Sequence, residues 1–146
     1  MLQDILLTQQ RELADRLKEP YVERKIVCTW GLDDDLIKVI AGPRRSGKSF
    51  YGLHLIQQTR SYGYVNFDDE RLAGIGDYDE IISAVKAVYG NPRYLLFDEI
   101  QNLPRWEMFA NRLQRQGFRL LICARCFNPR STRTSSSGSK YGRFRA

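Results

Sequence analysis

Between residues 42 and 49 the chain reads Gly42-Pro43-Arg44-Arg45-Ser46-Gly47-Lys48-Ser49. This run matches the pattern G-x-x-x-x-G-K-[ST], in which glycines let backbone N–H groups turn inward around phosphate oxygens. A short apolar run precedes it at residues 36–41, and a helix-compatible segment follows at residues 50–59. The order of strand, glycine-containing loop and helix predicts a phosphate-binding loop at the positive N-terminus of a helix.

All eight loop residues are therefore candidates for binding a nucleotide, and two of their side chains have a defined chemical task. In a loop of this pattern the lysine, here Lys48, reaches the β- and γ-phosphates, and the hydroxyl of Ser49 binds Mg²⁺. We expect ATP and Mg²⁺ as cofactors and assign Lys48 to both binding and catalysis. Arg44 and Arg45 occupy the free positions of the loop, and we assign them no individual role.

Farther along the chain, four large apolar residues end in two carboxylates. The run reads Tyr94-Leu95-Leu96-Phe97-Asp98-Glu99. A buried parallel strand of this kind presents Asp98 and Glu99 at its carboxyl end, where ligands bind in open α/β sheets. We assign Asp98 to Mg²⁺, directly or through water, and Glu99 to polarising the water that attacks the γ-phosphate.

Apolar periodicity predicts an α/β fold in which strands alternate with helices. The expected strands are residues 36–41, 64–67, 94–97 and 118–122, and the expected helices are residues 3–18, 50–59, 79–89 and a segment that begins near Trp106 and ends at Gly117. Such alternation implies a parallel sheet with right-handed crossovers, flanked by helices. The stretch 25–30 is compatible with either a strand or a helix.

Several other polar and aromatic residues are better explained without a functional role. Asp68, Asp69 and Glu70 follow the second strand and are candidates to flank the site, but a solvated strand end is the favoured interpretation. We interpret His54 as a surface or packing residue of its helix. The tryptophans Trp30 and Trp106 are expected in the core.

Charge divides the chain into a neutral body and a basic tail. Residues 1–124 contain 17 Lys/Arg and 17 Asp/Glu, whereas residues 125–146 contain six basic residues and no acidic one. We expect a P-loop ATPase domain at residues 1–124 and a disordered Ser/Arg-rich tail at residues 125–146. Nucleic acid is a weaker candidate partner of this tail, because the tail offers charge but little aromatic surface for stacking.

Composition also points to the cytoplasm. The three cysteines, Cys28, Cys123 and Cys126, form no disulfide framework, which suits a reducing compartment, and the C-x-x-C spacing of the last two alone is weak grounds for a metal site. No run approaches the length of a membrane span, and the N-terminus does not follow the order of a signal peptide. We therefore expect no membrane partner.

Three segments resemble a family of prokaryotic AAA-type P-loop ATPases. They are the run at residues 42–49, Tyr64-Val65-Asn66-Phe67-Asp68-Asp69-Glu70-Arg71-Leu72, and Tyr94-Leu95-Leu96-Phe97-Asp98-Glu99-Ile100-Gln101-Asn102-Leu103-Pro104-Arg105-Trp106-Glu107. In that family an ATPase head is usually followed by winged-helix and nuclease-like regions. The resemblance, over about residues 20–122, implies the additional-strand AAA/RecA-like fold, with the fourth strand between the P-loop strand and the strand that ends in the two acids. It also implies Mg²⁺-dependent ATP hydrolysis.

This chain departs from the family at the end of the fourth strand. The family usually carries a small polar run there, whereas this chain reads Cys123-Ala124-Arg125. We interpret the C-terminus as aberrant, with the sheet truncated after the fourth core strand. The fifth strand that the fold implies would pair with residues 36–41, and we expect nothing in the tail to supply it, which predicts an exposed sheet edge and self-association.

These observations support more than one function. The leading hypothesis is an ATP-binding AAA-type domain that descends from an ATPase and turns over slowly without its C-terminal half. The alternative is a nucleotide-binding remnant that hydrolyses nothing and acts as a protein-interaction module. A small-molecule phosphotransferase is disfavoured, because no segment of the chain reads as an acceptor pocket with a mobile lid.

Overall fold

The computed structural model describes residues 1–23, 32, 34–125 and 142–145. Its helices are α1 (Leu2–Arg16), α2 (Lys48–Ile56), α3 (Tyr78–Tyr89) and α4 (Trp106–Arg115). Its strands are β1 (Lys38–Ala41), β2 (Tyr62–Asn66), β3 (Tyr94–Asp98), β4 (Arg119–Ala124) and β5 (Gly142–Arg145). Three short 3₁₀ turns connect them, η1 (Gln57–Thr59), η2 (Glu70–Leu72) and η3 (Ile100–Asn102). Each helix and strand expected from the periodicity within these residues is present, with ends that differ by a few positions.

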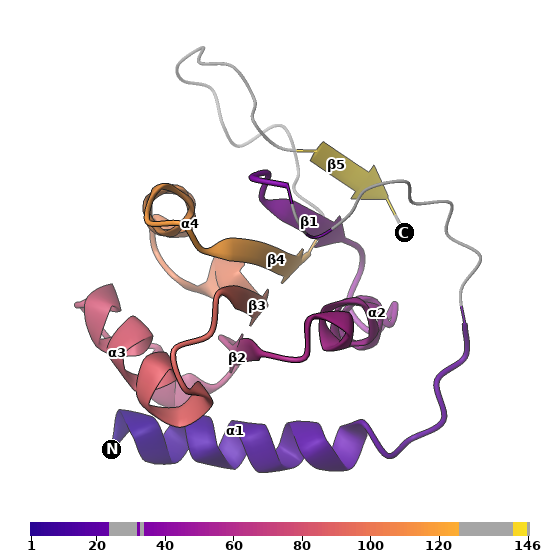
Figure 1. The fold of residues 1–146 in the computed structure, drawn as a ribbon, viewed down its shortest axis with the longest axis horizontal. Helices are drawn as coiled ribbons and strands as arrows, with labels where there is room; N and C mark the ends of the chain where they lie inside the picture. The colour runs from indigo at the N-terminus through magenta and orange to yellow at the C-terminus, as the bar shows by residue number, and fades with distance from the viewer. Residues whose placement is uncertain (24–31, 33, 126–141, 146) are drawn as a thin grey trace.

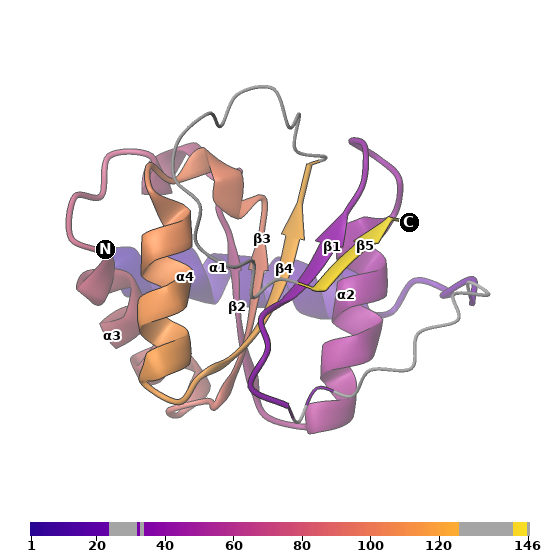
Figure 2. The same cartoon turned by 90° about the horizontal axis from the view of Figure 1, so that it is seen from above.

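The strands form one parallel sheet in the order β2-β3-β4-β1-β5. Figure 2 shows the arrowheads of β1, β3 and β4 at the same end of the sheet. The fourth strand lies between β1 and β3, as the resemblance implies. The predicted α/β fold with a parallel sheet flanked by helices is confirmed.

The prediction that the sheet stops after its fourth strand is wrong. β5 pairs in parallel with β1, with Lys38 opposite Gly142 and Ala41 opposite Arg145. Our expectation rested on the poor strand propensity of residues 129–139, but the strand forms later, around Phe144, an aromatic residue that favours strands. Because β1 has partners on both sides, the reason to expect self-association through an unpaired edge of β1 no longer holds.

Helices cover both faces of the sheet (Figure 1). α2 lies on one face, and α3 and α4 lie on the other. Alternate side chains of the central strands enter the two layers, so that Leu95 and Phe97 join the cluster on the α3 and α4 side while Leu96 joins the cluster on the α2 side. This period of two explains why the buried strands read as continuous apolar runs.

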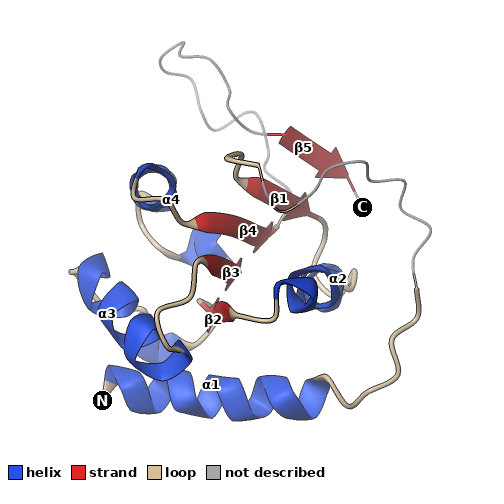
Figure 3. Ribbon diagram, viewed as in Figure 1, coloured by secondary structure: helices blue, strands red, loops and turns tan. Residues whose placement is uncertain are grey.

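α1 runs across the edge of the sheet beside β2 (Figure 3). Its apolar stripe buries Ile5, Leu6 and Leu13. Between them lies Gln9, whose side chain is 2% exposed and bonds to the backbone of β2 as a neighbouring strand would. Its amide donates to Asn66 O at 3.1 Å, and Asn66 N donates to Gln9 Oε1 at 3.0 Å.

None of the helices within the described ranges is long and apolar enough to cross a membrane. The stretch 25–30, Trp30, Cys28, Cys126 and most of the predicted tail lie outside the described residues. The disorder expected for the tail therefore stays a prediction.

Candidate functional site

The loop that follows β1 contains two residues with a left-handed backbone. Gly47 adopts φ 79° immediately before α2, and Arg45 is also left-handed at φ 62°. Successive residues of alternating hand turn their N–H groups toward one side of the chain. Among the described residues no side chain caps the first turn of α2, so its N–H groups are available to an anion.

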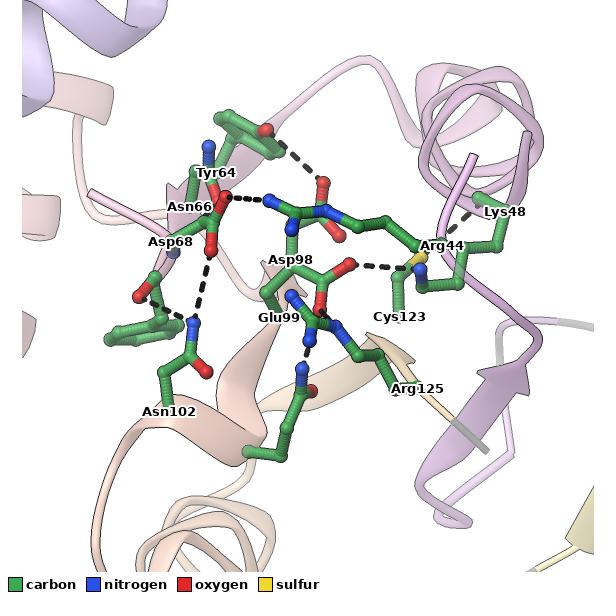
Figure 4. A network of polar contacts seen from close by, with 12 residues as sticks. Arg44, Lys48, Tyr64, Asn66, Asp68, Asp98, Glu99, Asn102, Cys123 and Arg125 are labelled. Carbon is green, nitrogen blue, oxygen red and sulfur yellow. Dashed lines mark hydrogen bonds and ion pairs between the residues drawn. The ribbon is translucent and has the colours of Figure 1, made fainter. Parts of the chain in front are cut away.

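The lysine of the loop meets the second acid of β3. Lys48 Nζ lies 2.8 Å from Glu99 Oε1, and the two side chains are 3% and 12% exposed. Both residues were predicted from separate motifs, and the fold brings them together at the carboxyl end of the sheet (Figure 4). A cation and a carboxylate this deeply buried interact strongly, because little solvent screens them.

Glu99 has an unusual backbone and several polar partners. It takes φ 53° and ψ 37° directly after β3, a left-handed conformation that is strained for a residue with a side chain. Its N–H donates to Cys123 O at 2.8 Å, which holds the turn in place. Its Oε2 accepts from Gln101 Nε2 and lies 3.3 Å from Arg125 Nε. Burial raises the pKa of Glu99, but the hydrogen bonds from Lys48 and Gln101 outweigh it and lower that pKa below its usual value.

Asp98 is buried more deeply and has fewer partners. Its side chain accepts from Tyr64 Oη at 3.5 Å through Oδ2, while Oδ1 has no hydrogen bond to any residue in the described ranges. Burial raises the pKa of Asp98, and the hydroxyl of Ser49, which lies close by, opposes the shift. Burial also raises the pKa of Tyr64, so the phenol stays protonated and acts as the donor.

Asp98 and Ser49 together offer the kind of ligands that a magnesium ion prefers. Mg²⁺ prefers hard oxygen ligands and is usually held by one or two protein side chains together with substrate phosphates. The free Oδ1 of Asp98 and the neighbouring hydroxyl of Ser49 offer such oxygens. Within the described residues no group of three or more His, Cys, Asp or Glu side chains is placed to hold a metal by itself.

Asp68 is an exposed residue after β2 whose carboxylate contacts the loop. Its carboxylate lies 3.5 Å from Arg44 Nη2 of the loop and accepts from Asn102 Nδ2 at 3.4 Å. Asp69 instead points to α1, where it accepts from Gln9 Nε2 at 3.1 Å. The exposure of Asp68 fits the favoured interpretation of a solvated strand end, and its contact with Arg44 leaves the alternative, a place flanking the site, open as a prediction.

The structure adds residues that no motif announced. Tyr64, Gln101 and Arg125 contact the acid pair, yet the sequence suggested an individual role for none of them. Only Gln101, two residues after Glu99, had a position that suggested proximity. Tyr64 and Arg125 reach the acids from neighbouring strands, a relation that depends on strand order.

Three candidates remain, and of these Cys123 lies beside the acids, opposite Asp98 in the sheet. His54 is exposed on α2 and stacks on Tyr21 with ring centroids 4.0 Å apart, as expected for a surface residue. Trp106 is 6% exposed and belongs to the core, which confirms its predicted place. Cys123 is a buried free thiol whose Sγ lies 3.5 Å from Lys48 O, and burial raises its pKa.

Comparison with known proteins places the chain in a family. The family described as an AAA domain matches residues 34–137, a range that continues past residue 124, where we predicted the domain to end. An uncharacterised protein of Methanocaldococcus jannaschii is 39% identical over 90 residues, which are 59% of this chain and 20% of that protein. An uncharacterised protein of Haemophilus influenzae is 34% identical over 92 residues, 56% of this chain and 23% of that protein.

The chain thus spans about a fifth of the length of these curated relatives. No solved structure matches it. The family match covers well over half of the chain and includes both the loop and the strand that ends in Asp98 and Glu99. This chain therefore belongs to the AAA-domain family.

Proposed function

We propose that the chain binds ATP with Mg²⁺ between the loop of residues 42–49 and the carboxyl end of β3. The observation that carries this proposal is the buried contact of 2.8 Å between Lys48 Nζ and Glu99 Oε1. In a P-loop site the lysine binds phosphate and an acid in the position of Glu99 orients the attacking water, so this contact joins the two groups that the reaction needs. Family membership supports nucleotide binding in general.

Each residue has a role that follows from its position. The N–H groups of residues 42–49 and of the first turn of α2 bind phosphate oxygens. Lys48 exchanges Glu99 for the β- and γ-phosphates, since a phosphate carries more charge than one carboxylate. Asp98 and Ser49 hold Mg²⁺, which supplies positive charge that neutralises the phosphates. Burial of Lys48 and Asp98 keeps water from weakening these interactions.

Hydrolysis follows from the same arrangement. Once Lys48 has moved to phosphate, Glu99 is free to accept a hydrogen bond from a water molecule and orient it toward the γ-phosphorus. The bond from that water to phosphorus forms as the bond between phosphorus and the β-phosphate oxygen breaks, and the proton of the water passes to Glu99. ADP and inorganic phosphate leave.

We further propose that this turnover is slow in the isolated chain. In phosphoryl transfer an arginine from a partner can contribute about 10³ to 10⁵ in rate. Glu99 is also held by Lys48, Gln101 and Arg125, contacts that compete with the water. The same contacts favour the second candidate function, a nucleotide-binding module without turnover.

Titration of Mg-ATP into the purified chain, with phosphate release followed in parallel, tests both parts. We expect saturable binding that EDTA abolishes, together with phosphate release far below 1 s⁻¹, on the order of 0.01 s⁻¹ or less. Absence of saturable binding contradicts the nucleotide site. Turnover on the order of 1 s⁻¹ that disappears in Glu99→Gln contradicts the slow rate.

A further inference from the structure

The two oxygens of the Asp98 carboxylate have different surroundings. Oδ2 accepts a hydrogen bond from Tyr64 Oη at 3.5 Å, whereas Oδ1 has no hydrogen-bond partner within the described ranges. Both side chains are 3% exposed, so little solvent competes for these oxygens. The protein therefore engages one oxygen of the candidate magnesium ligand and leaves the other for an ion.

The sheet itself places the phenol of Tyr64 beside Asp98. In the parallel pair of β2 and β3, Tyr64 lies opposite Leu96, and Asn66 lies opposite Asp98. Tyr64 and Leu96 both belong to the cluster on the α2 side. Asp98, two residues after Leu96, lies on the same face, because side chains alternate along a strand. Tyr64 and Asp98 are thus diagonal neighbours on one face, within reach of a long aromatic side chain, as Figure 4 shows.

Backbone hydrogen bonds hold the end of β2 in the position that this contact needs. Phe67 N donates to Asp98 O at 2.9 Å, directly after the pair of Asn66 and Asp98. On the other side of β2, the side chain of Gln9 bonds to the C=O and the N–H of Asn66 at 3.1 and 3.0 Å. The phenol of Tyr64 therefore approaches Asp98 from a strand that is fixed on both sides.

The number of oxygens that a carboxylate offers affects which cation it suits. Ca²⁺ accepts carboxylates through one oxygen or through two, whereas Mg²⁺ is smaller and requires near-ideal octahedral geometry. A carboxylate whose second oxygen accepts a hydrogen bond from the protein binds an ion more readily through one oxygen than through two. Hydrogen bonds of this kind orient metal ligands and affect the affinity for the metal.

We propose that Tyr64 is a positioning residue that makes Asp98 offer Oδ1 alone, and that it thereby favours Mg²⁺ over Ca²⁺ at the bound nucleotide. This inference rests on the proposed function. In this role Tyr64 acts through Asp98 and not on the nucleotide. Removal of its hydroxyl frees Oδ2, so that the carboxylate can turn and offer both oxygens, a mode that Ca²⁺ accepts more readily than Mg²⁺.

The test measures the affinity of the purified chain for a non-hydrolysable ATP analogue in Mg²⁺, in Ca²⁺ and in EDTA. In the wild type, Mg²⁺ should tighten binding more than Ca²⁺ does. In Tyr64→Phe we expect the affinity in Mg²⁺ to fall about tenfold and the affinities in Ca²⁺ and in EDTA to change less than about twofold, because a group that supports a metal ligand is lost. The affinity in EDTA reports any general damage to the loop.

Tyr62→Phe is the matched control, because it removes the same hydroxyl from the first residue of the same strand, where the side chain lines a hollow with Leu13 and Tyr89. It should leave all three affinities unchanged. In a chain that already carries Asp98→Asn, Tyr64→Phe should cause no further loss in Mg²⁺, because the phenol acts through that carboxylate.

Two results for the variants overturn the inference. An equal loss in Mg²⁺, Ca²⁺ and EDTA shows that Tyr64 supports only the fold, and an unchanged ratio of the affinities in Mg²⁺ and Ca²⁺ shows that it does not position the ligand. The wild type tests the proposed function separately. If it does not bind the analogue, or if Mg²⁺ does not tighten the binding, the proposed function fails and this inference fails with it.

Discussion

The loop of residues 42–49 and the end of β4 face the same acid pair, yet only the loop is recognisable in the sequence. The loop acts through its backbone, so glycines at fixed positions and one lysine identify it. Arg125 acts through a single long side chain whose target, Glu99, lies 26 residues earlier on a neighbouring strand. A site built from the backbone of one loop can be recognised from a local sequence pattern. A contact that depends on the order of the strands cannot be recognised in this way.

The largest effect on Mg-ATP binding should come from a substitution in the loop of residues 42–49. Lys48→Ala removes the buried cation of the loop, and we expect it to weaken Mg-ATP binding about 100-fold or more. Equilibrium dialysis or calorimetry measures this change. Lys18→Ala, at an exposed position beyond α1, is the control and should have no effect. A comparable loss in both variants would show that Lys48 contributes only general charge.

Glu99→Gln separates nucleotide binding from turnover. The amide keeps a hydrogen-bond acceptor for Lys48 but accepts no proton from water, so we expect nearly unchanged affinity and at least a tenfold loss of any measurable phosphate release. The test measures both the affinity for Mg-ATP and the rate of phosphate release in the same variant. A loss of affinity as large as that of Lys48→Ala would contradict the separate roles of the two residues.

The contact between α1 and β2 should have the next largest effect. Gln9→Ala leaves the N–H and C=O of Asn66 without their buried partners, and we expect the free energy of unfolding to fall by about 2–3 kcal/mol. Denaturant unfolding measures the change. Gln3→Ala, on the exposed face of the same helix, should be neutral. Equal stability of the two variants would show that the side chain of Gln9 is not needed at the sheet edge.

Packing between α2 and β4 gives a smaller effect. A Cβ at Gly52 would lie 2.7 Å from Cys123 Sγ, so Gly52→Ala should lower the free energy of unfolding by about 1–3 kcal/mol. In the double variant Gly52→Ala/Cys123→Ala the sulfur is absent, and we expect the penalty of the glycine substitution to shrink. Gly74→Ala, where nothing lies within 4 Å, is the control. Strict additivity of the two substitutions would rule out the close approach as the cause.

The smallest effect depends on pH. The hydrogen bond from Arg71 lowers the pKa of Asp69 from 3.8 to about 2, so the folded state favours the charged carboxylate. Its stabilising contribution is complete above the ordinary value and is lost as the pH falls toward about 2. Asp69→Asn should therefore lower the thermal midpoint near pH 7 and have a much smaller effect near pH 2, where about half of the carboxylate is protonated in the folded state. Glu19→Gln, at an exposed position, should show no such change.

The sequence predicted the fold better than it predicted the side-chain contacts within the site. Apolar runs such as residues 94–97 and the helical spacing of Ile81, Ile82 and Val85 report burial locally, so the elements and their alternation could be recognised. β5 escaped notice because a four-residue strand needs only backbone partners from β1. The contact of Asp68 with Arg44 could not be inferred either, because β3 and β4 separate β1 from β2 and the loop after β1 has to bring Arg44 to the end of β2.

The central claim is that phosphate binds in the loop and draws Lys48 away from Glu99. Amide chemical shifts of the isotope-labelled chain during titration with Mg-ATP test it most directly. The account predicts saturable chemical-shift changes for the amides of Glu99 and of residues 43–49 other than the proline. In Lys48→Ala the same changes should no longer reach saturation. Saturable shifts confined to another region, such as the hollow lined by Leu13, Tyr62 and Tyr89, with none in the loop, would contradict it.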